Sequence, residues 1–438
     1  MKPELENMIW DKAETLNRDD LAVLQLERLK RQAAHAMNVP FYKNAFAKAG
    51  VTPDDIKSLD DIRRLPFTTK ADMRENYPLG LMAVSRDDIA RIHGSSGTTG
   101  KPTFVAYTKE DMKTWSNLVA RFLVAGGLRA KHIAQVAFGY GLFTGGFGLH
   151  YGIETVGAAV VPASAGNTPR QLMLLEDLGV DVLICTPSYA LNLAEIAAEM
   201  NCIDRLKLKF AHFGGEPWTE DMRRQIEDML QIYAFNNYGL SEVIGPGVSG
   251  ECIYRRGMHF QEDHFIVECI NPKTLEPVAA GEKGELVITS LTKQAMPVIR
   301  YRTRDIASID DSPCQCGRTG RRMSRVIGRT DDMMIIRGVN IFPSQIEEAI
   351  LRIEGTAPHY LIELSRPGAL DIITVKVEIL PNIFSDRMSE MQNLHDRLVR
   401  EIQNVIGVRP NVELVKPQSL ERFVGKAKRV VDNRKLAD

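Results

Sequence analysis

The sequence has few cysteines, almost no net charge and no long apolar run. Six cysteines among 438 residues are too few for the disulfide framework of a small secreted domain. A formal net charge of −1 argues against a nucleic-acid-binding surface. No stretch approaches the ~18 apolar residues of a membrane span, and the charged N-terminal stretch lacks the apolar segment of a signal peptide. We therefore expect a cytoplasmic protein that binds neither nucleic acid nor membrane.

The apolar residues that are present predict an α/β fold. Residues 11–50 show helical periodicity, and the preceding NRDD offers an N-cap. From about residue 130, short apolar strands alternate with helical segments. The predicted strands include IAQVAF, GAAVVPAS, VDVLICT, LKFAHFGG and QIYAFNNYG. Such alternation predicts a parallel sheet covered on both faces.

The character of the chain changes twice more toward the C-terminus. Short strands separated by turn residues, such as HFIVECI and GELVITSL, predict a small antiparallel, barrel-like unit. The last segment alternates helices and strands and predicts a compact α+β module. We place the boundary near GRTDD, giving a large N-terminal domain of residues 1–330 with parallel α/β subdomains and the barrel-like unit, and a small C-terminal domain of residues 331–438.

The segment HGSSGTTGKPTFVAYT, from His93 to Thr108, suits phosphate. Backbone amides and hydroxyls from Ser95 to Gly100, with the ammonium group of Lys101, can face anionic oxygens. The segment is not a P-loop, because residue 95 is Ser where that motif has Gly, and Pro102 stands where it has Ser or Thr. The β-branched and aromatic residues after Pro102 predict a strand. We therefore predict a strand–loop–strand phosphate cradle, with a flexible surface loop as the weaker alternative.

Four further motifs carry groups that suit a nucleotide, although each alone has a plain structural explanation. YGLSE offers Tyr238 for a planar base and Glu242 for magnesium, and a strand-to-loop turn explains it nearly as well. YRTRD places Asp305 at a strand end, where it suits ribose hydroxyls or a surface ion pair. GRTDD puts paired acids at the domain junction, as a hinge or an exposed linker. Lys426 lies in a glycine-flanked basic segment where lysines are often merely solvated.

Three cysteines and one histidine form a candidate zinc set. Cys314 and Cys316 lie in a turn-rich loop, and Cys252 precedes His259 by seven positions. Both segments flank the predicted barrel-like unit, and such donors can hold zinc tetrahedrally with no open position for chemistry. Reduced thiols without a metal are the alternative, and His264 is a competing ligand.

In order and spacing, the five motifs resemble those of the adenylate-forming acyl-CoA synthetase superfamily. The resemblance is closest to its phenylacetate–CoA ligase branch, through GYGLFTGGFGLHYG, GGEPWT, YGLSEVIGPGV, QEDHF and IIRGVNIFPSQIEEAIL, and it runs from about residue 10 to the end. It implies a two-step reaction: a carboxylate attacks the ATP α-phosphate, and CoA then takes the acyl group after a mobile C-terminal domain rotates. It also suggests a homodimer.

The resemblance implies a role for each matching residue. ATP phosphates would lie against Ser95, Ser96, Gly97, Thr98, Thr99, Gly100 and Lys101. The adenine site would be lined by Gly215, Glu216, Pro217, Tyr238 and Gly239. Ser241 would contact the α-phosphate, Glu242 would bind Mg²⁺, and Asp305 and Arg329 would hold the ribose. Asp331 would be the hinge. Lys426 would stabilise the charge that develops on the α-phosphate.

The acid and the acyl acceptor stay open at this point. Tyr140, Phe143, Phe147 and Gly214, with Phe138, suit a flat aryl group in a narrow pocket, although a glycine-rich helix packed on a sheet explains the same stretch. Phenylacetate is the first candidate, and indoleacetate and benzoate are alternatives. The acceptor is expected to be CoA, with a carrier protein or an amine as the alternative. A nucleotide sensor without catalysis ranks last, because Glu242, Asp305 and Lys426 are intact.

Overall fold

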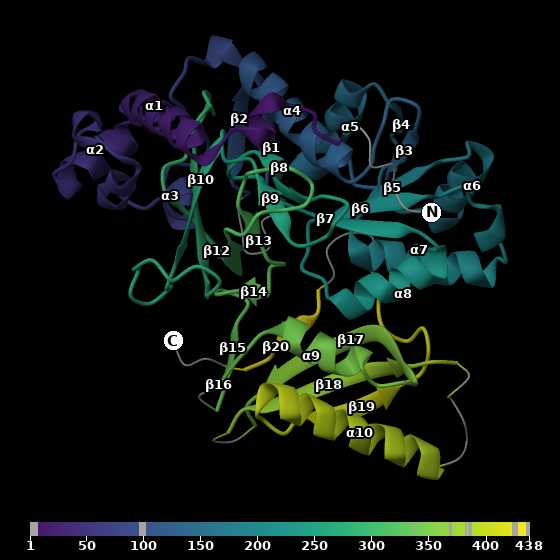
Figure 1. The fold of residues 1–438 in the computed structure, drawn as a ribbon. Helices are drawn as coiled ribbons and strands as arrows, with labels where there is room; N and C mark the ends of the chain where they lie inside the picture. Colours follow the sequence, from purple (N-terminus) through teal and green to yellow (C-terminus); the bar gives the residue numbers. More distant parts are fainter. Residues whose placement is uncertain are drawn as a thin grey trace.

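The computed structural model describes residues 8–95, 102–337, 339–367, 370–381, 383, 388–422 and 428–434. Figure 1 shows a broad upper body and a smaller lower unit that contains β17–β20, α9 and α10. None of the helices in these described ranges is long and apolar enough to cross a bilayer.

The N-terminal helices lie along one side of the upper body. The helical periodicity of residues 11–50 corresponds to two helices, α1 (Arg18–Ala36) and α2 (Pro40–Ala49), because Pro40 starts a new one. Asn17 caps α1, as predicted, by accepting from the Asp20 amide. The remaining short elements are η1 (Lys12–Thr15), η2 (Pro53–Asp55), η3 (Leu59–Arg64), α3 (Lys70–Glu75) and η4 (Arg86–Asp88).

A β-hairpin carries the phosphate-loop segment. Strand β1 (Ile89–Gly94) pairs antiparallel with β2 (Phe104–Thr108), and Gly94 lies opposite Phe104. The two predicted strands are therefore confirmed, while Ser96, Gly97, Thr98, Thr99, Gly100 and Lys101 between them lie outside the described residues. Helix α4 (Lys109–Ala125) follows at once, with a capping box between Thr108 and Asp111.

The predicted parallel sheet is confirmed. Its strands are β3 (Ile133–Val136), β4 (Ala159–Val161), β5 (Val182–Cys185), β6 (Phe210–Gly214) and β7 (Tyr233–Leu240), in the order β4-β3-β5-β6-β7. The intervening helices are α5 (Thr144–Val156), α6 (Thr168–Asp177), α7 (Pro187–Glu199), η5 (Ile203–Arg205) and α8 (Glu220–Leu230). Apolar side chains of α6, α7 and α8 pack with β5 and β6 in one buried cluster.

The antiparallel strands continue the same sheet. Strand β8 pairs antiparallel with β7, and the hydrogen-bonded path runs on through β9, β13, β12, β11 and β10. The predicted barrel-like unit is thus linked to the parallel sheet within one twelve-stranded arrangement. The strands are β8 (Gly245–Glu251), β9 (Met258–Phe260), β10 (Phe265–Ile270), β11 (Lys283–Ser290), β12 (Tyr301–Asp310), β13 (Arg322–Met323) and β14 (Gly328–Arg329).

The C-terminal part has its own sheet and its own core. A four-stranded sheet of order β19-β18-β17-β20 packs with α9 and α10, and its buried cluster draws only on residues from Met334 onward. The predicted α+β character is confirmed, while β15, β16 and β20 were not predicted. The elements are β15 (Met334–Ile336), β16 (Val339–Ile341), α9 (Pro343–Leu351), β17 (Thr356–Ser365), β18 (Ile372–Ile379), α10 (Met388–Ile406), β19 (Asn411–Val415) and β20 (Val430–Asp432).

Candidate functional site

A cavity of about 190 Å³ opens where β6 and β7 end. In an open α/β sheet, ligands bind outside the carboxyl ends of the strands, and residues that follow β6 and end β7 form much of this wall. The motifs predicted to bind a nucleotide thus converge on one cavity. Predicted site residues in its wall are Ser95, Phe143, Gly215, Glu216, Pro217, Tyr238, Gly239, Ser241, Glu242, Asp305 and Arg329.

Tyr238, Asp305 and Arg329 form a hydrogen-bonded chain along this wall. The Tyr238 hydroxyl donates to Asp305 Oδ2 at 2.6 Å, and an Arg329 NH group donates to Asp305 Oδ1 at 3.1 Å. Strand pairing sets this up, because Asp305 of β12 lies directly opposite Arg329 of β14. Burial and the Asp305 carboxylate raise the pKa of Tyr238, so its hydroxyl keeps its proton as a donor. The structure therefore joins two motifs that lie far apart in the sequence.

Glu242 brings a carboxylate to the cavity beside a lysine. The Glu242 side chain is 8% exposed, and its Oε1 lies 3.4 Å from Lys70 Nζ. Lys70 is the first residue of α3 and was missed by the sequence analysis. A lysine is electrostatically unfavourable at the N-terminal end of a helix, which carries partial positive charge. This unfavourable placement is the sequence signal that could have identified Lys70. Carboxylate oxygens suit Mg²⁺, so Glu242 could hold a magnesium ion together with ligand oxygens.

Ser241 and Phe143 meet at the start of α5. The Ser241 hydroxyl lies 2.9 Å from the Thr144 hydroxyl, and Phe143 is the N-cap residue of the same helix. Both Ser241 and Thr144 line the cavity, so hydroxyls and the α5 N-terminus face one region of it. Helix N-termini favour anionic groups. This end of the cavity can therefore accept a phosphate or carboxylate.

The base of the predicted phosphate cradle is closed by two hydrogen bonds. The Ser95 amide donates to the Thr103 carbonyl at 2.9 Å, and the Thr103 amide donates to the Ser95 hydroxyl at 3.1 Å. Ser95 also lines the cavity. The cradle therefore begins at the cavity wall.

The segment after β6 contributes backbone and one anchored side chain. Gly215 adopts φ +86°, a conformation that glycine takes without strain. Glu216 Oε1 accepts from the Ser188 amide at 2.8 Å, at the N-terminal end of α7. This contact fixes the wall formed by Gly215, Glu216 and Pro217.

Three of the four predicted acyl-pocket residues do not line the cavity as it is described. Tyr140 donates to or accepts from His150 Nδ1 at 3.1 Å, and Phe147 packs edge-on against Tyr140 with ring centroids 5.2 Å apart. Phe147 lies one turn after Phe143 in α5 and also stacks on Tyr151, with ring centroids 6.3 Å apart. Gly214 lies where β6 and β7 approach closely, since an added Cβ would meet Asn237 Oδ1 at 2.6 Å. The apolar wall instead consists of Phe138, Phe143, Leu149, Trp218, Leu240, Pro246 and Met258.

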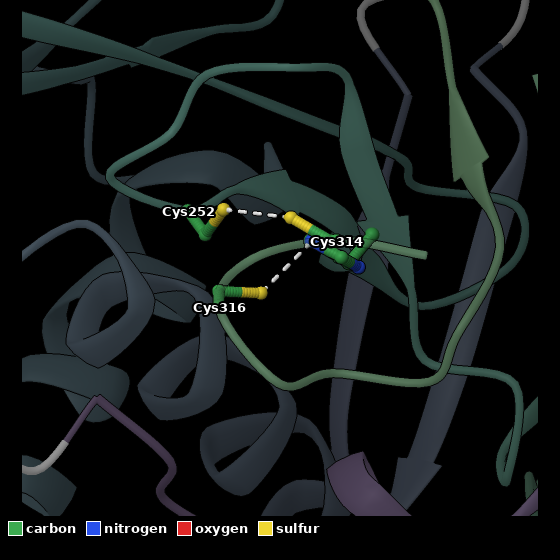
Figure 2. A group of neighbouring side chains, drawn as sticks. Cys252, Cys314 and Cys316 are labelled. Carbon is green, nitrogen blue, oxygen red and sulfur yellow. Dashed lines mark hydrogen bonds between the residues drawn. The ribbon is translucent and has the colours of Figure 1, made fainter. Parts of the chain in front are cut away.

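The candidate zinc residues come together. The donor atoms of Cys252, His259, Cys314 and Cys316 all lie within 4.8 Å of one another. Cys252 Sγ is 3.8 Å from Cys314 Sγ, and Cys316 Sγ is 3.4 Å from His259 Nε2 (Figure 2). Hydrogen bonds from Cys252 and His259 lower the pKa of Cys316 far below that of an ordinary thiol. His264 is outside the group, because it contacts Thr292 and Asp263 instead.

Asp331 and Lys426 are the remaining predicted residues. Arg329 Nε lies 2.9 Å from Asp331 Oδ1, so the candidate hinge is tied to the candidate ribose site. Lys426 lies outside the described residues.

The chain matches known proteins along most of its length. Residues 23–296 match the model of the AMP-binding enzyme family, and residues 338–434 match that of the AMP-binding enzyme C-terminal domain. The chain is 49% identical to a phenylacetate–coenzyme A ligase of Aromatoleum evansii, over 96% of each chain. It is 47% identical to the ligase of that name from Thermus thermophilus, over 98% of this chain and all of the relative.

A solved structure shares the arrangement of the whole chain. The crystal structure of 2-hydroxyisobutyryl-CoA ligase in the postadenylation state, with an acyl adenylate bound, matches with a TM-score of 0.93 and 28% identity over 99% of this chain and 94% of that one. The same ligase in its thioesterification state matches with a TM-score of 0.73 over the same shares.

Proposed function

This chain belongs to the AMP-binding enzyme family, in the branch of the phenylacetate–coenzyme A ligases, and we propose that its own substrate is an aryl carboxylic acid, with phenylacetate the first candidate. It is an ATP-dependent ligase that activates an acid as an acyl adenylate and transfers the acyl group to CoA. The observation that carries the proposal for its site is the convergence of Tyr238, Asp305 and Arg329 with Glu242 on one cavity.

We assign the nucleotide to the polar part of this cavity. Asp305 and Arg329 suit the ribose, because a carboxylate and a guanidinium can together bind its hydroxyls. Tyr238, with Gly239 beside it, suits the adenine, together with Gly215, Glu216 and Pro217. The hydroxyl of Ser241 suits the α-phosphate. The run from Ser95 through Lys101 (Ser96, Gly97, Thr98, Thr99 and Gly100 between them) is proposed to hold the outer phosphates.

We propose Glu242 as the Mg²⁺ ligand, beside Lys70. When bound, Mg²⁺ offsets negative charge on the leaving pyrophosphate. Two lysine side chains of the protein support this site. Lys70 lies 3.4 Å from Glu242, so it adds a positive charge where phosphate oxygens are expected. The buried lysine Lys293 donates to the Glu242 carbonyl at 3.4 Å and so orients this segment.

We propose that the two steps use two arrangements of the domains 1–330 and 331–438, with Asp331 as the hinge. The attacking carboxylate already bears its charge, so no general base is needed. Lys426 is proposed to stabilise the α-phosphate more strongly in the transition state than before it, which is what lowers the barrier. A lysine on a mobile domain can then be withdrawn, and that motion can limit turnover.

The apolar wall supports an aryl group. Phe138 and Phe143 meet Leu149 and Trp218 in the same cavity, and aromatic and aliphatic walls suit a flat ring. Indoleacetate and benzoate stay as alternative acids, and a carrier protein stays as an alternative acceptor.

We propose that Cys252, His259, Cys314 and Cys316 hold one structural Zn²⁺. A tetrahedral site with Zn–S of about 2.3 Å places its sulfur atoms about 3.8 Å apart, and Cys252 and Cys314 have this separation. The low pKa of Cys316 fits a thiolate ligand. With four protein donors, no position is left open for a substrate, so the site would stabilise loops.

A homodimer and a cytoplasmic location complete the proposal. Both rest on the family: ATP and CoA are intracellular metabolites, and the resemblance suggests a dimer.

The deciding experiment measures AMP release from ATP and magnesium, with and without CoA, across phenylacetate, indoleacetate, benzoate, hexanoate and acetate. We expect the fastest CoA-dependent release with phenylacetate. Preference for a larger or smaller aryl acid would change the assigned substrate but not the assigned reaction. Pyrophosphate release with no thioester product would favour a carrier protein as acceptor, and silence across the panel would contradict the proposal.

A further inference from the structure

Charged and polar side chains join helix α7 to the C-terminal part of the chain. Glu195 Oε1 of α7 lies 2.7 Å from His359 Nε2 of β17, a contact between residues 164 positions apart. Arg422 Nε lies 3.8 Å from the other oxygen of Glu195. One turn further along α7, Glu199 accepts from Gln418 Nε2 at 2.7 Å, across 219 positions. Figure 1 shows α7 and α8 facing the lower unit that contains β17 and α9.

Glu378 holds the C-terminal side of this contact in place. Its two oxygens accept from Arg422 at 2.8 Å each, and they also accept from the amides of Gln418 and Leu420. Burial acts to raise the pKa of Glu378, but the hydrogen bonds from Arg422 and Leu420 outweigh it and lower the pKa, so the carboxylate stays charged. Arg422 is thus fixed by its own domain before it reaches Glu195.

The Glu195 contact is partly buried. The side chain of His359 is 7% exposed and that of Glu195 is 25% exposed. An exposed ion pair contributes little to stability. A pair withdrawn from water is screened less by solvent and salt, and breaking it leaves a buried group without its partner. This group therefore has more influence on the arrangement of the two domains than a surface pair would have.

Two other contacts between the two parts lie beside the proposed hinge. Ser344 donates to the Ile327 carbonyl, and Arg325 lies 3.5 Å from Glu348. Contacts next to a hinge shift little when a domain rotates, whereas contacts remote from it must separate. The α7 contacts are made by segments remote in sequence from Asp331, so we expect them to be made in one arrangement only.

The arrangement observed resembles that of a relative in its postadenylation state. The fold superposes on the postadenylation state of 2-hydroxyisobutyryl-CoA ligase with a TM-score of 0.93, and on its thioesterification state with a TM-score of 0.73. Because both comparisons are with the same ligase over the same shares of the two chains, the lower score reflects a different arrangement of its parts. We therefore assign the α7 contacts to the arrangement of the first half-reaction, whose product is the acyl adenylate.

We propose that Glu195 is a positioning residue for adenylate formation, because it docks the C-terminal domain on α7 through His359 and Arg422. Its side chain does not line the cavity. This inference rests on the proposed two-step function and identifies residues that set the balance between its two arrangements. A ligand binding equally to both arrangements cannot shift that balance, whereas a contact present in only one can.

The test separates the two half-reactions in Glu195→Ala. Acid-dependent ATP–pyrophosphate exchange should fall by about fivefold, the upper range of a partly exposed pair. Thioester formation from supplied acyl adenylate should be unchanged or faster. Glu195→Gln, which keeps an acceptor for His359, should recover part of the exchange rate. A general loss of structure would instead reduce both half-reactions.

A matched control removes a comparable ion pair inside the N-terminal part. Glu176 Oε1 lies 2.5 Å from Arg205 Nε, with Glu176 32% exposed, and Glu176→Ala should leave both half-reactions unchanged.

Hydrogen–deuterium exchange supplies a readout that needs no activity. In Glu195→Ala, the peptide covering 187–199 should exchange faster than in the wild type. Unchanged exchange at α7, or equal loss of both half-reactions, would overturn the docking role. Absence of pyrophosphate exchange in the wild type would instead contradict the proposed function, and the exchange of α7 would still decide the docking.

Discussion

At the scale of single residues, the carboxylate of Asp305 links two other side chains of the candidate nucleotide site. It accepts from Tyr238 on one side and from Arg329 on the other, and its side chain is 9% exposed. Sequence alone could not distinguish it from a surface ion pair, because the pairing of β12 with β14 creates the site. A ligand hydroxyl that approaches Asp305 would meet a charged acceptor already oriented by two donors.

Asp305→Asn should weaken the use of ATP. It removes the charge that pairs with Arg329 and with a ribose hydroxyl, and hydrogen bonds to charged groups contribute about 1.5–3 kcal/mol. We expect kcat/KM for ATP to fall roughly 10- to 100-fold. The control is Asp310→Asn on the same strand. The Asp310 carboxylate lies 2.6 Å from the Arg322 guanidinium, and Asp310 does not line the cavity. Equal losses in both variants would argue against a nucleotide role for Asp305.

His212 predicts acid sensitivity of the fold. Its ring is fully buried, both ring nitrogens lack a partner among the described residues, and burial lowers its pKa to about 3. The unfolded chain takes up this proton near pH 6.5, so the free energy of unfolding falls as pH drops below that value. The loss between pH 7 and pH 5 is about 2 kcal/mol for this one group.

His212→Leu should remove that part of the pH dependence. Urea unfolding at pH 7 and pH 5 measures it, because all other groups titrate alike in both proteins. Phe235→Leu, a change in the ring that packs against His212, should lower stability equally at both pH values. A pH dependence unchanged by His212→Leu would show that the histidine is not held neutral.

More of the predicted polar residues than of the predicted apolar residues line the cavity. Tyr238, Glu242 and Asp305 have side chains whose chemistry narrows their role, and the structure brings them to one cavity. Tyr140 and Phe147 have rings that pack equally well in a core, and here they pack against other aromatic side chains. Which side of α5 faces a cavity depends on the sheet beneath it, which short-range sequence does not specify.

At the scale of elements, the Cys/His group joins segments that also build the cavity. Cys252 follows β8, and His259 lies in β9 next to the cavity residue Met258. The loop of Cys316 continues to Arg318, which pairs with Glu14 at 2.6 Å, and the Thr319 amide donates to the Glu14 carbonyl. A metal here would therefore hold the N-terminal segment as well as two strands.

Removing the metal should loosen this region. We expect about one zinc ion per purified chain, and chelation should lower Tm by at least about 5 °C. It should also expose the segment around 8–17 to protease. Cys316→Ser should reproduce both effects, whereas Cys269→Ser, a half-buried thiol outside the group, should not. A metal-free protein with unchanged Tm would contradict the site.

Elements were predicted where their own periodicity is strong. The parallel strands are short apolar runs between helices, and all five were predicted. Strands β9 and β20 have three residues each, too few for a pattern, and they exist because a partner strand is present. Helices α1 and α2 were merged because apolar spacing continues across Pro40, although a proline restricts the residue before it.

At the scale of the whole molecule, the C-terminal part has a core separate from the buried clusters of the N-terminal part. The buried C-terminal cluster contains only residues from 334 onward. Leu351, also in the C-terminal part, packs instead against the buried cluster of α6, α7 and α8. A unit with its own core can unfold by itself. The predicted boundary at 330/331 stays a proposal, and this separation supports it.

Calorimetry of the full chain should resolve two transitions. The smaller should carry about 70 kcal/mol, since unfolding enthalpy is about 0.7 kcal/mol per residue and the unit has roughly 100 residues. A non-hydrolysable ATP analogue with Mg²⁺ should raise the temperature of the larger transition before that of the smaller one. The reason is that most of the cavity wall belongs to the larger unit. A single transition with equal calorimetric and van't Hoff enthalpies would contradict separate cores.

The position of α1 has a consequence for how a cell makes this chain. Gln25 donates to the Glu262 carbonyl, 237 positions later, and Glu14 pairs with Arg318, 304 positions later. At about 5–20 residues per second, a ribosome needs roughly 12–60 s to supply these partners. During that time α1 can pack only against nearby segments such as η2 and η3, and the side chains of Gln25 and Glu14 lack their partners. Slow codons between these segments would lengthen the wait, and we expect such a nascent chain to depend on ribosome-associated chaperones.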